Sequence, residues 1–246
     1  MVTKPYLQVP IAESGAPLVP LPEQVFAYPQ PHVYQALGAP YDGASPFSVR
    51  EPILQALIQA QDNLQQDHPQ WQILIFDAYR PVAVQAFMVN HTFEQALKQC
   101  QLQPEQLTPT QINDLWEQVY QLWAVPNLDP KAPPPHSTGA AVDATLYNRQ
   151  TQEPVFMGSP IDELSARSHP DYFAHLATDP QAPAPARAEA RVAAQHRQIL
   201  YTAMRGAGFQ RHPGEWWHFS MGDQLWVWLT QQENPNAEGV AWYGRV

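Results

Sequence analysis

The chain has 246 residues, of which 44% are hydrophobic, and it carries a formal net charge of −10. This length suits one domain with a substantial core and is short for two full domains. The acidic balance excludes binding to nucleic acid or to an anionic membrane surface through a basic patch. No run of about 18 apolar residues is present, so we expect no membrane span.

The beginning of the chain differs in character from the rest. Residues 1–47 are rich in proline and lack helical periodicity, so we expect an irregular arm that lies over a domain formed by residues 48–246. Ser48 could cap a first helix, in which apolar residues recur at helical spacing from about residue 50 to residue 66.

The middle of the chain alternates between short apolar runs and longer periodic segments. Residues 73–76 predict a buried strand, and the patterns at residues 82–99 and 108–123 predict two helices. The proline-rich stretch at residues 126–139 predicts a loop, and residues 140–147 alternate as a strand does.

The last third contains the clearest helix of the chain, at residues 186–208, with Gly206 or Gly208 as its stop. Residues 215–220 and 224–229 are interpreted as a closing pair of strands. The order of elements is not a regular alternation of strand and helix. We therefore predict a single α+β domain with a mainly antiparallel central sheet flanked by helices.

The single cysteine, Cys100, cannot form an internal disulfide, which favours a reducing compartment. Prolines interrupt the first 20 residues, and no apolar stretch of signal-peptide length occurs there. We therefore expect a cytoplasmic protein. Cys100 follows a helical pattern, which favours a small buried or helix-end residue over a nucleophile.

Two segments carry residue types that suit a metal site. His136 and Asp143 are seven residues apart, and Gly139 between them would let the backbone turn so that the two side chains converge. Glu215 and His218 are three apart, so on a regular strand they would face opposite sides. Each pair alone is also compatible with an ordinary surface, capping or rim position.

Together the two segments indicate more than either does alone. Two histidines and one carboxylate leave a fourth tetrahedral position for water, which is typical of a catalytic zinc site. Glu215 could take a proton from that water. Arg80 directly follows the predicted strand and could bind a substrate carboxylate or an oxyanion, or else form a salt bridge with Asp77.

The segments that carry these residues resemble the D-alanyl-D-alanine dipeptidases of the vancomycin-resistance type. These enzymes belong to a superfamily of zinc D,D-peptidases. The resemblance covers roughly residues 50–222 and rests on four stretches: FDAYRP at 76–81, HSTGAAVDATLY at 136–147, FMGSPIDELSARSH at 156–169 and MRGAGFQRHPGEWWHFS at 204–220. The third stretch and the doubled tryptophan are narrower than the metal motif and favour the dipeptidase branch.

The resemblance implies one zinc ion per chain. His136, Asp143 and His218 match the zinc ligands, and the ion is expected in a cleft at the sheet. Glu215 matches the catalytic base that takes a proton from the zinc-activated water.

The resemblance also implies how a small D-amino-acid dipeptide is held. Arg80 matches the arginine that stabilises the transition state. Asp162 matches the acidic residue that holds the free ammonium of the dipeptide, with Tyr34 as a helper. The family usually has serines just before the first histidine, whereas prolines stand at residues 133–135 of this chain.

Two other functions remain open at this stage. A D,D-carboxypeptidase or endopeptidase of the same superfamily would use the same zinc site on longer cell-wall peptides. A non-catalytic zinc-binding module would keep the ligands and lose the glutamate or the arginine. Glu215 and Arg80 are both present, which favours an enzyme.

Overall fold

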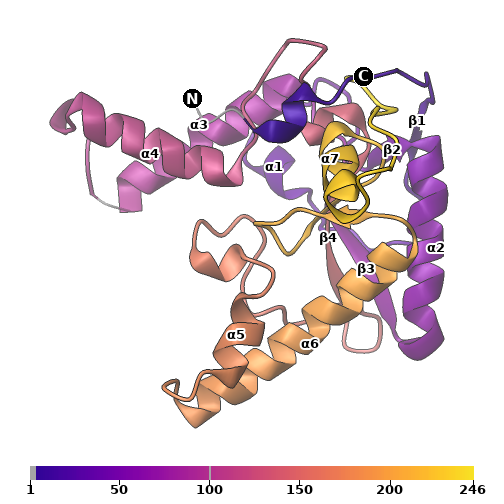
Figure 1. Ribbon diagram of the computed structural model, residues 1–246. Helices are drawn as coiled ribbons and strands as arrows, with labels where there is room; N and C mark the ends of the chain where they lie inside the picture. Colours follow the sequence, from indigo (N-terminus) through magenta and orange to yellow (C-terminus); the bar gives the residue numbers. More distant parts are fainter. Residues whose placement is uncertain (1–3, 100) are drawn as a thin grey trace.

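The computed structural model describes residues 4–99 and 101–246 (Figure 1). Its central sheet is antiparallel, with the strand order β3-β4-β7-β6 and with β5 paired to β4. The strands are β3 (Trp71–Asp77), β4 (Ala141–Asn148), β5 (Glu153–Pro154), β6 (Gln210–Arg211) and β7 (His218–Ser220). The predicted α+β class with a mainly antiparallel sheet is confirmed.

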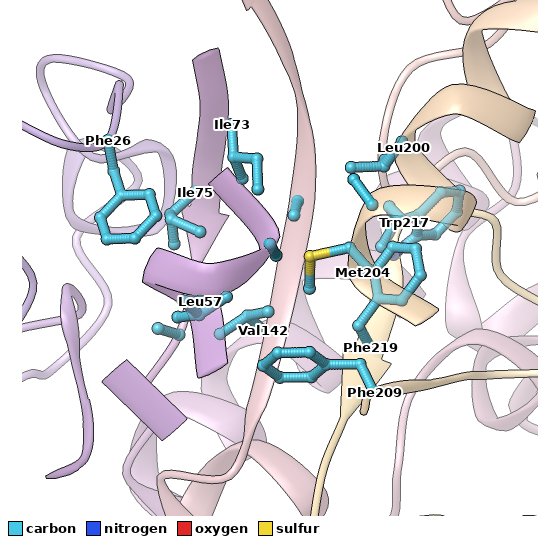
Figure 2. Packing of buried hydrophobic residues seen from close by; sticks show 14 of the residues in the cluster. Phe26, Leu57, Ile73, Ile75, Val142, Leu200, Met204, Phe209, Trp217 and Phe219 are labelled. Carbon is cyan, nitrogen blue, oxygen red and sulfur yellow. The ribbon is translucent and has the colours of Figure 1, made fainter. Parts of the chain in front are cut away.

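Two long helices, α2 (Glu51–Asp67) and α6 (Ala184–Gly206), pack beside each other and against the sheet. The main hydrophobic core lies where these helices meet the sheet, and β3, β4 and α6 contribute Ile73, Val142 and Met204 to it (Figure 2). A buried Val, Leu, Ile, Phe or Met side chain stabilises a fold by about 1.5–3 kcal/mol, so this core holds the site's strands in place.

Two further helices, α3 (Val82–Gln99) and α4 (Pro109–Leu122), form a hairpin that extends to one side of the molecule (Figure 1). Thr108, which the sequence placed inside the helix, caps α4 through a capping box with Gln111. A second, smaller core lies beneath this hairpin and includes Tyr34 and Trp123. Cys100 lies outside the described residues.

The arm is irregular over most of its described length but contains short elements. These are the 3-10 helix η1 (Pro5–Gln8), strand β1 (Leu18–Pro20) and helix α1 (Val33–Ala36). Strand β1 pairs with β2 (Ser48–Arg50), directly before α2. This pairing ties the arm to the rest of the protein.

Further short elements connect the main ones. They are the 3-10 helices η2 (Pro104–Gln106), η3 (Pro135–Thr138) and η4 (Ala166–Ser168), and the helix α5 (Tyr172–Thr178), which packs on α6. No helix in the described part of the chain is both long and apolar enough to cross a membrane.

Two sequence-based predictions about local structure are wrong. Residues 224–229 lie in a helix, α7 (Gln224–Glu233), and not in a strand. Short apolar runs fit either structure, and here the Asp223 side chain decides because it accepts a hydrogen bond from the Trp226 amide and caps the helix. Ser48 lies in β2, and the residue at the N-cap of α2 is Arg50.

Candidate functional site

Three potential metal ligands meet at the sheet. Asp143 on β4 and His218 on β7 are direct partners in the antiparallel pairing, so the sheet itself sets their separation. His136 comes from η3, which ends at Gly139 in a left-handed conformation with φ of 72°. A Cβ at Gly139 would collide with Leu18, so glycine is needed at this turn, as expected.

The donor atoms of these three residues face one another. His136 Nε2 lies 3.2 Å from His218 Nδ1 and 3.3 Å from an Asp143 carboxylate oxygen. His218 Nδ1 lies 3.1 Å from the other Asp143 oxygen. All three residues are buried, and their donor atoms lie within 4.8 Å of one another, so the group could bind a metal ion.

Neighbouring groups orient the His136 ring and keep the Asp143 carboxylate charged, and both effects favour cation binding. His136 Nδ1–H donates to the Ala78 carbonyl at 2.8 Å, which directs the lone pair of Nε2 towards Asp143 and His218. Burial alone would raise the pKa of Asp143, but the neighbouring His136 and His218 hold it well below its usual range. Asp143 would therefore be a charged ligand, and the set of two imidazoles and one carboxylate suits zinc.

Glu215 lies next to this group of potential ligands and is not part of it. Strand β7 begins only at His218, and Glu215 precedes it in a turn. The two side chains therefore do not have to face opposite sides, as residues three apart on a regular strand would. The carboxylate oxygens of Glu215 lie 3.7 Å from His218 Nδ1 and 3.6 Å from His212 Nδ1. Burial and the charge of Asp143 raise the pKa of Glu215 well above its ordinary value, which suits a group that exchanges protons.

Arg80 forms the salt bridge with Asp77 that was one of the two interpretations of its position. Its Nε donates to Asp77 at 2.9 Å, which is the predicted salt bridge, and Nη2 donates to Asp143 at 3.1 Å. Nη1 donates to Gln85 at 2.9 Å, and the guanidinium stacks over Trp123 at 4.9 Å. The arginine is thus held rigidly beside the ligand carboxylate.

Asp162 and Tyr34 meet although they are 128 positions apart in the chain, and the Tyr34 hydroxyl donates to Asp162 at 2.7 Å. Asp162 adopts a left-handed backbone conformation with φ of 63°. Burial, followed by the charge of Asp143, raises the pKa of Asp162 to about 7. The Arg80 guanidinium lies 3.3 Å from the Tyr34 hydroxyl, so this pair adjoins the group of ligands.

A small cavity adjoins most of these groups. Its volume is about 30 Å³, which matches about one water molecule. The ligands, Glu215, Arg80 and Asp162 line it. Sequence reasoning missed several other lining residues, namely Lys4, Tyr6, Gln85, Trp123 and His212. Of these, only His212 lies within one of the four stretches that carry the family resemblance.

The fold and these side chains define a candidate metal-dependent hydrolase centre: three converging donors beside a buried glutamate, with an arginine at the ligand carboxylate. Comparison with known proteins agrees with this class. Residues 28–237 match the peptidase M15 family model described as D-ala-D-ala dipeptidase. The chain belongs to this family.

Named relatives span this chain to different extents. A D-alanyl-D-alanine dipeptidase of Synechocystis is 49% identical over 99% of this chain and 97% of its own length. Another from Enterococcus faecium is 32% identical over 62% of this chain and 63% of its own length. One from Enterococcus faecalis is 36% identical over 36% of this chain and 37% of its own length.

Proposed function

We propose that the protein hydrolyses the D-alanyl-D-alanine dipeptide with one zinc ion held by His136, Asp143 and His218. The observation that carries this proposal is the convergence of the three donor atoms within 4.8 Å at one wall of a small cavity. The full-length relative that bears the name of this activity supports the substrate. The donor set of two imidazoles and a carboxylate supports zinc.

Zinc, when bound, would supply an activated water and polarise the peptide carbonyl. Glu215 accepts a proton from the attacking water and returns one to the leaving amine as the C–N bond breaks. Its raised pKa suits both transfers. A carbon–oxygen bond forms as the carbon–nitrogen bond is lost, so one water and one dipeptide give two D-alanines.

Arg80 contributes positive charge beside the reacting carbonyl. Its guanidinium is buried and held by Asp77, Gln85 and Asp143, so it needs little reorganisation during the reaction. Preorganised charge of this kind stabilises an oxyanion more than it stabilises the neutral carbonyl.

The Asp162–Tyr34 pair is proposed to hold the substrate ammonium. A carboxylate that is buried and hydrogen-bonded at the edge of a small cavity would bind a free amine and oppose an acylated one, whose polar groups would lose their partners. This arrangement favours a dipeptide with a free amino terminus over a longer wall peptide.

The test is to offer zinc-loaded protein three substrates: D-Ala-D-Ala, L-Ala-L-Ala and N-acetyl-D-Ala-D-Ala. We expect cleavage of the first and at most slow cleavage of the others, measured as D-alanine or L-alanine release. The Glu215→Gln variant serves as the control for contaminating peptidases. A preference for the acetylated peptide would overturn the dipeptidase proposal in favour of a D,D-carboxypeptidase, and no cleavage by metal-loaded protein would favour a binding module.

A further inference from the structure

The amino-terminal arm brings a lysine to the active-site cavity. Lys4 lines the same cavity as the metal ligands and Glu215, although it lies more than 200 positions from Glu215 in the sequence. It directly precedes η1, whose Tyr6 is buried and also lines the cavity. The arm is therefore part of the site and not only a cover for the domain.

The ammonium of Lys4 makes no ion pair or hydrogen bond within the described part of the chain, although the charge of Glu215 acts on it. Arg80, the other cation of the cavity, is already engaged with Asp77 and Asp143. The side chain of Lys4 is partly buried, and burial lowers its pKa while the charge of Glu215 opposes that shift. An unpaired, partly buried ammonium beside a cavity favours an anionic ligand group.

Lys4 and Glu215 line the same cavity, and the charge of each affects the pKa of the other group. In the proposed reaction Glu215 delivers a proton to the leaving amine, so the leaving residue of the dipeptide must lie on the Glu215 side. The carboxylate of that residue is only one carbon atom away from the amine.

We propose that Lys4 binds the free carboxylate of the substrate and so selects peptides that end directly after the cleaved bond. The inference rests on the proposed function, because it identifies how the second end of the same dipeptide is recognised. Asp162 would fix the ammonium end and Lys4 the carboxylate end, so a peptide extended at either end would lose one of the two contacts.

The test compares D-Ala-D-Ala with D-alanyl-D-alaninamide, which keeps the ammonium and the peptide bond but lacks the charged carboxylate. Zinc-loaded wild-type protein should prefer the acid by about tenfold to hundredfold in kcat/KM. Lys4→Met should bring this ratio close to one, mainly by raising the KM for the acid. Lys4→Arg should keep most of the preference, and Lys98→Met, which removes the same charge from an exposed site, should behave as wild type.

A second measurement separates binding from turnover. In the Glu215→Gln background, calorimetry should show that Lys4→Met weakens the binding of D-Ala-D-Ala and leaves that of the amide unchanged. If Lys4→Met lowers kcat/KM for acid and amide by the same factor, Lys4 acts only through Glu215 or as a cover, and the inference is overturned. If wild type cleaves neither compound, the proposed function itself fails.

Discussion

Replacement of Asp162 by asparagine tests how the substrate ammonium is recognised. Asparagine keeps the size of the side chain and can still accept a hydrogen bond from the Tyr34 hydroxyl, which lies 2.7 Å from Asp162. The substitution therefore removes the negative charge with little change in packing. The zinc ligands are not altered, so metal content should stay at the wild-type level.

The expected magnitude follows from the type of contact that is lost. A hydrogen bond to a charged group contributes about 1.5–3 kcal/mol, which corresponds to about a tenfold to hundredfold rise in the KM for D-Ala-D-Ala. The kcat should change much less, because Asp162 binds the ammonium and not the reacting carbonyl. The advantage of D-Ala-D-Ala over its N-acetyl form should shrink by a similar factor.

A pH profile gives an independent check. The pKa of Asp162 is raised to about 7, chiefly by burial, so the charged form that binds ammonium is depleted as pH falls. A zinc ion at Asp143 would offset the share of the shift that Asp143 causes. We expect the KM of the wild-type protein to rise towards low pH. The inflection should lie between about pH 4, the ordinary pKa of an aspartate, and the raised pKa of Asp162.

This inflection should be missing from the Asp162→Asn variant, while inflections caused by other groups should remain in both proteins. The reasoning is refuted if the variant keeps the wild-type KM and the wild-type preference for the free dipeptide. It is also refuted if only kcat falls, since that result would place Asp162 in the chemical step.

The remaining predictions concern the metal centre and its neighbours. Single alanine variants of His136, Asp143 and His218 should each lose most of the bound zinc, measured by atomic absorption after dialysis, and full retention would disprove the ligand set. Glu215→Gln should keep zinc and lose about two to four decades of kcat, whereas near wild-type turnover would move the base elsewhere. Arg80→Met leaves buried carboxylates uncompensated and should lower the free energy of unfolding by about 3–5 kcal/mol in urea titrations. Arg80→Lys should recover most of that stability but little of the activity, because lysine cannot reproduce the fork of donors.

The sequence predicted the structure well where a site motif or a helix lies within one continuous segment. His136 and Asp143 belong to a single stretch, and the glycine between them has the positive φ that the turn was expected to need. The helices α3 and α4 have long periodic patterns and were predicted nearly to their ends. In such segments, local sequence and final structure agree because no distant partner is needed to decide between them.

Prediction failed where distant contacts or a short pattern decide the outcome. The apolar run of α7 is too short to distinguish a strand from a helix, and the cap from Asp223 settles it. Nothing in the irregular arm marks Lys4 or Tyr6 as cavity residues, because their places depend on packing against α7. The contact between Tyr34 and Asp162 likewise joins parts of the chain that show no shared pattern.

The proposed metal ligands and the proposed substrate-binding residues come from different parts of the chain. Asp143 and His218 are direct partners on paired strands, so backbone hydrogen bonds fix their spacing before any ion arrives. Tyr34 and Lys4 come instead from the arm, which meets the central sheet on β3, at the bridge between Ala27 and Leu74, and not at the pairing of β4 with β7. Changes in these two residues can therefore alter substrate preference while the proposed ligands keep their geometry. For this reason the KM should respond to substitutions of Lys4 and Tyr34 much more strongly than the zinc affinity does.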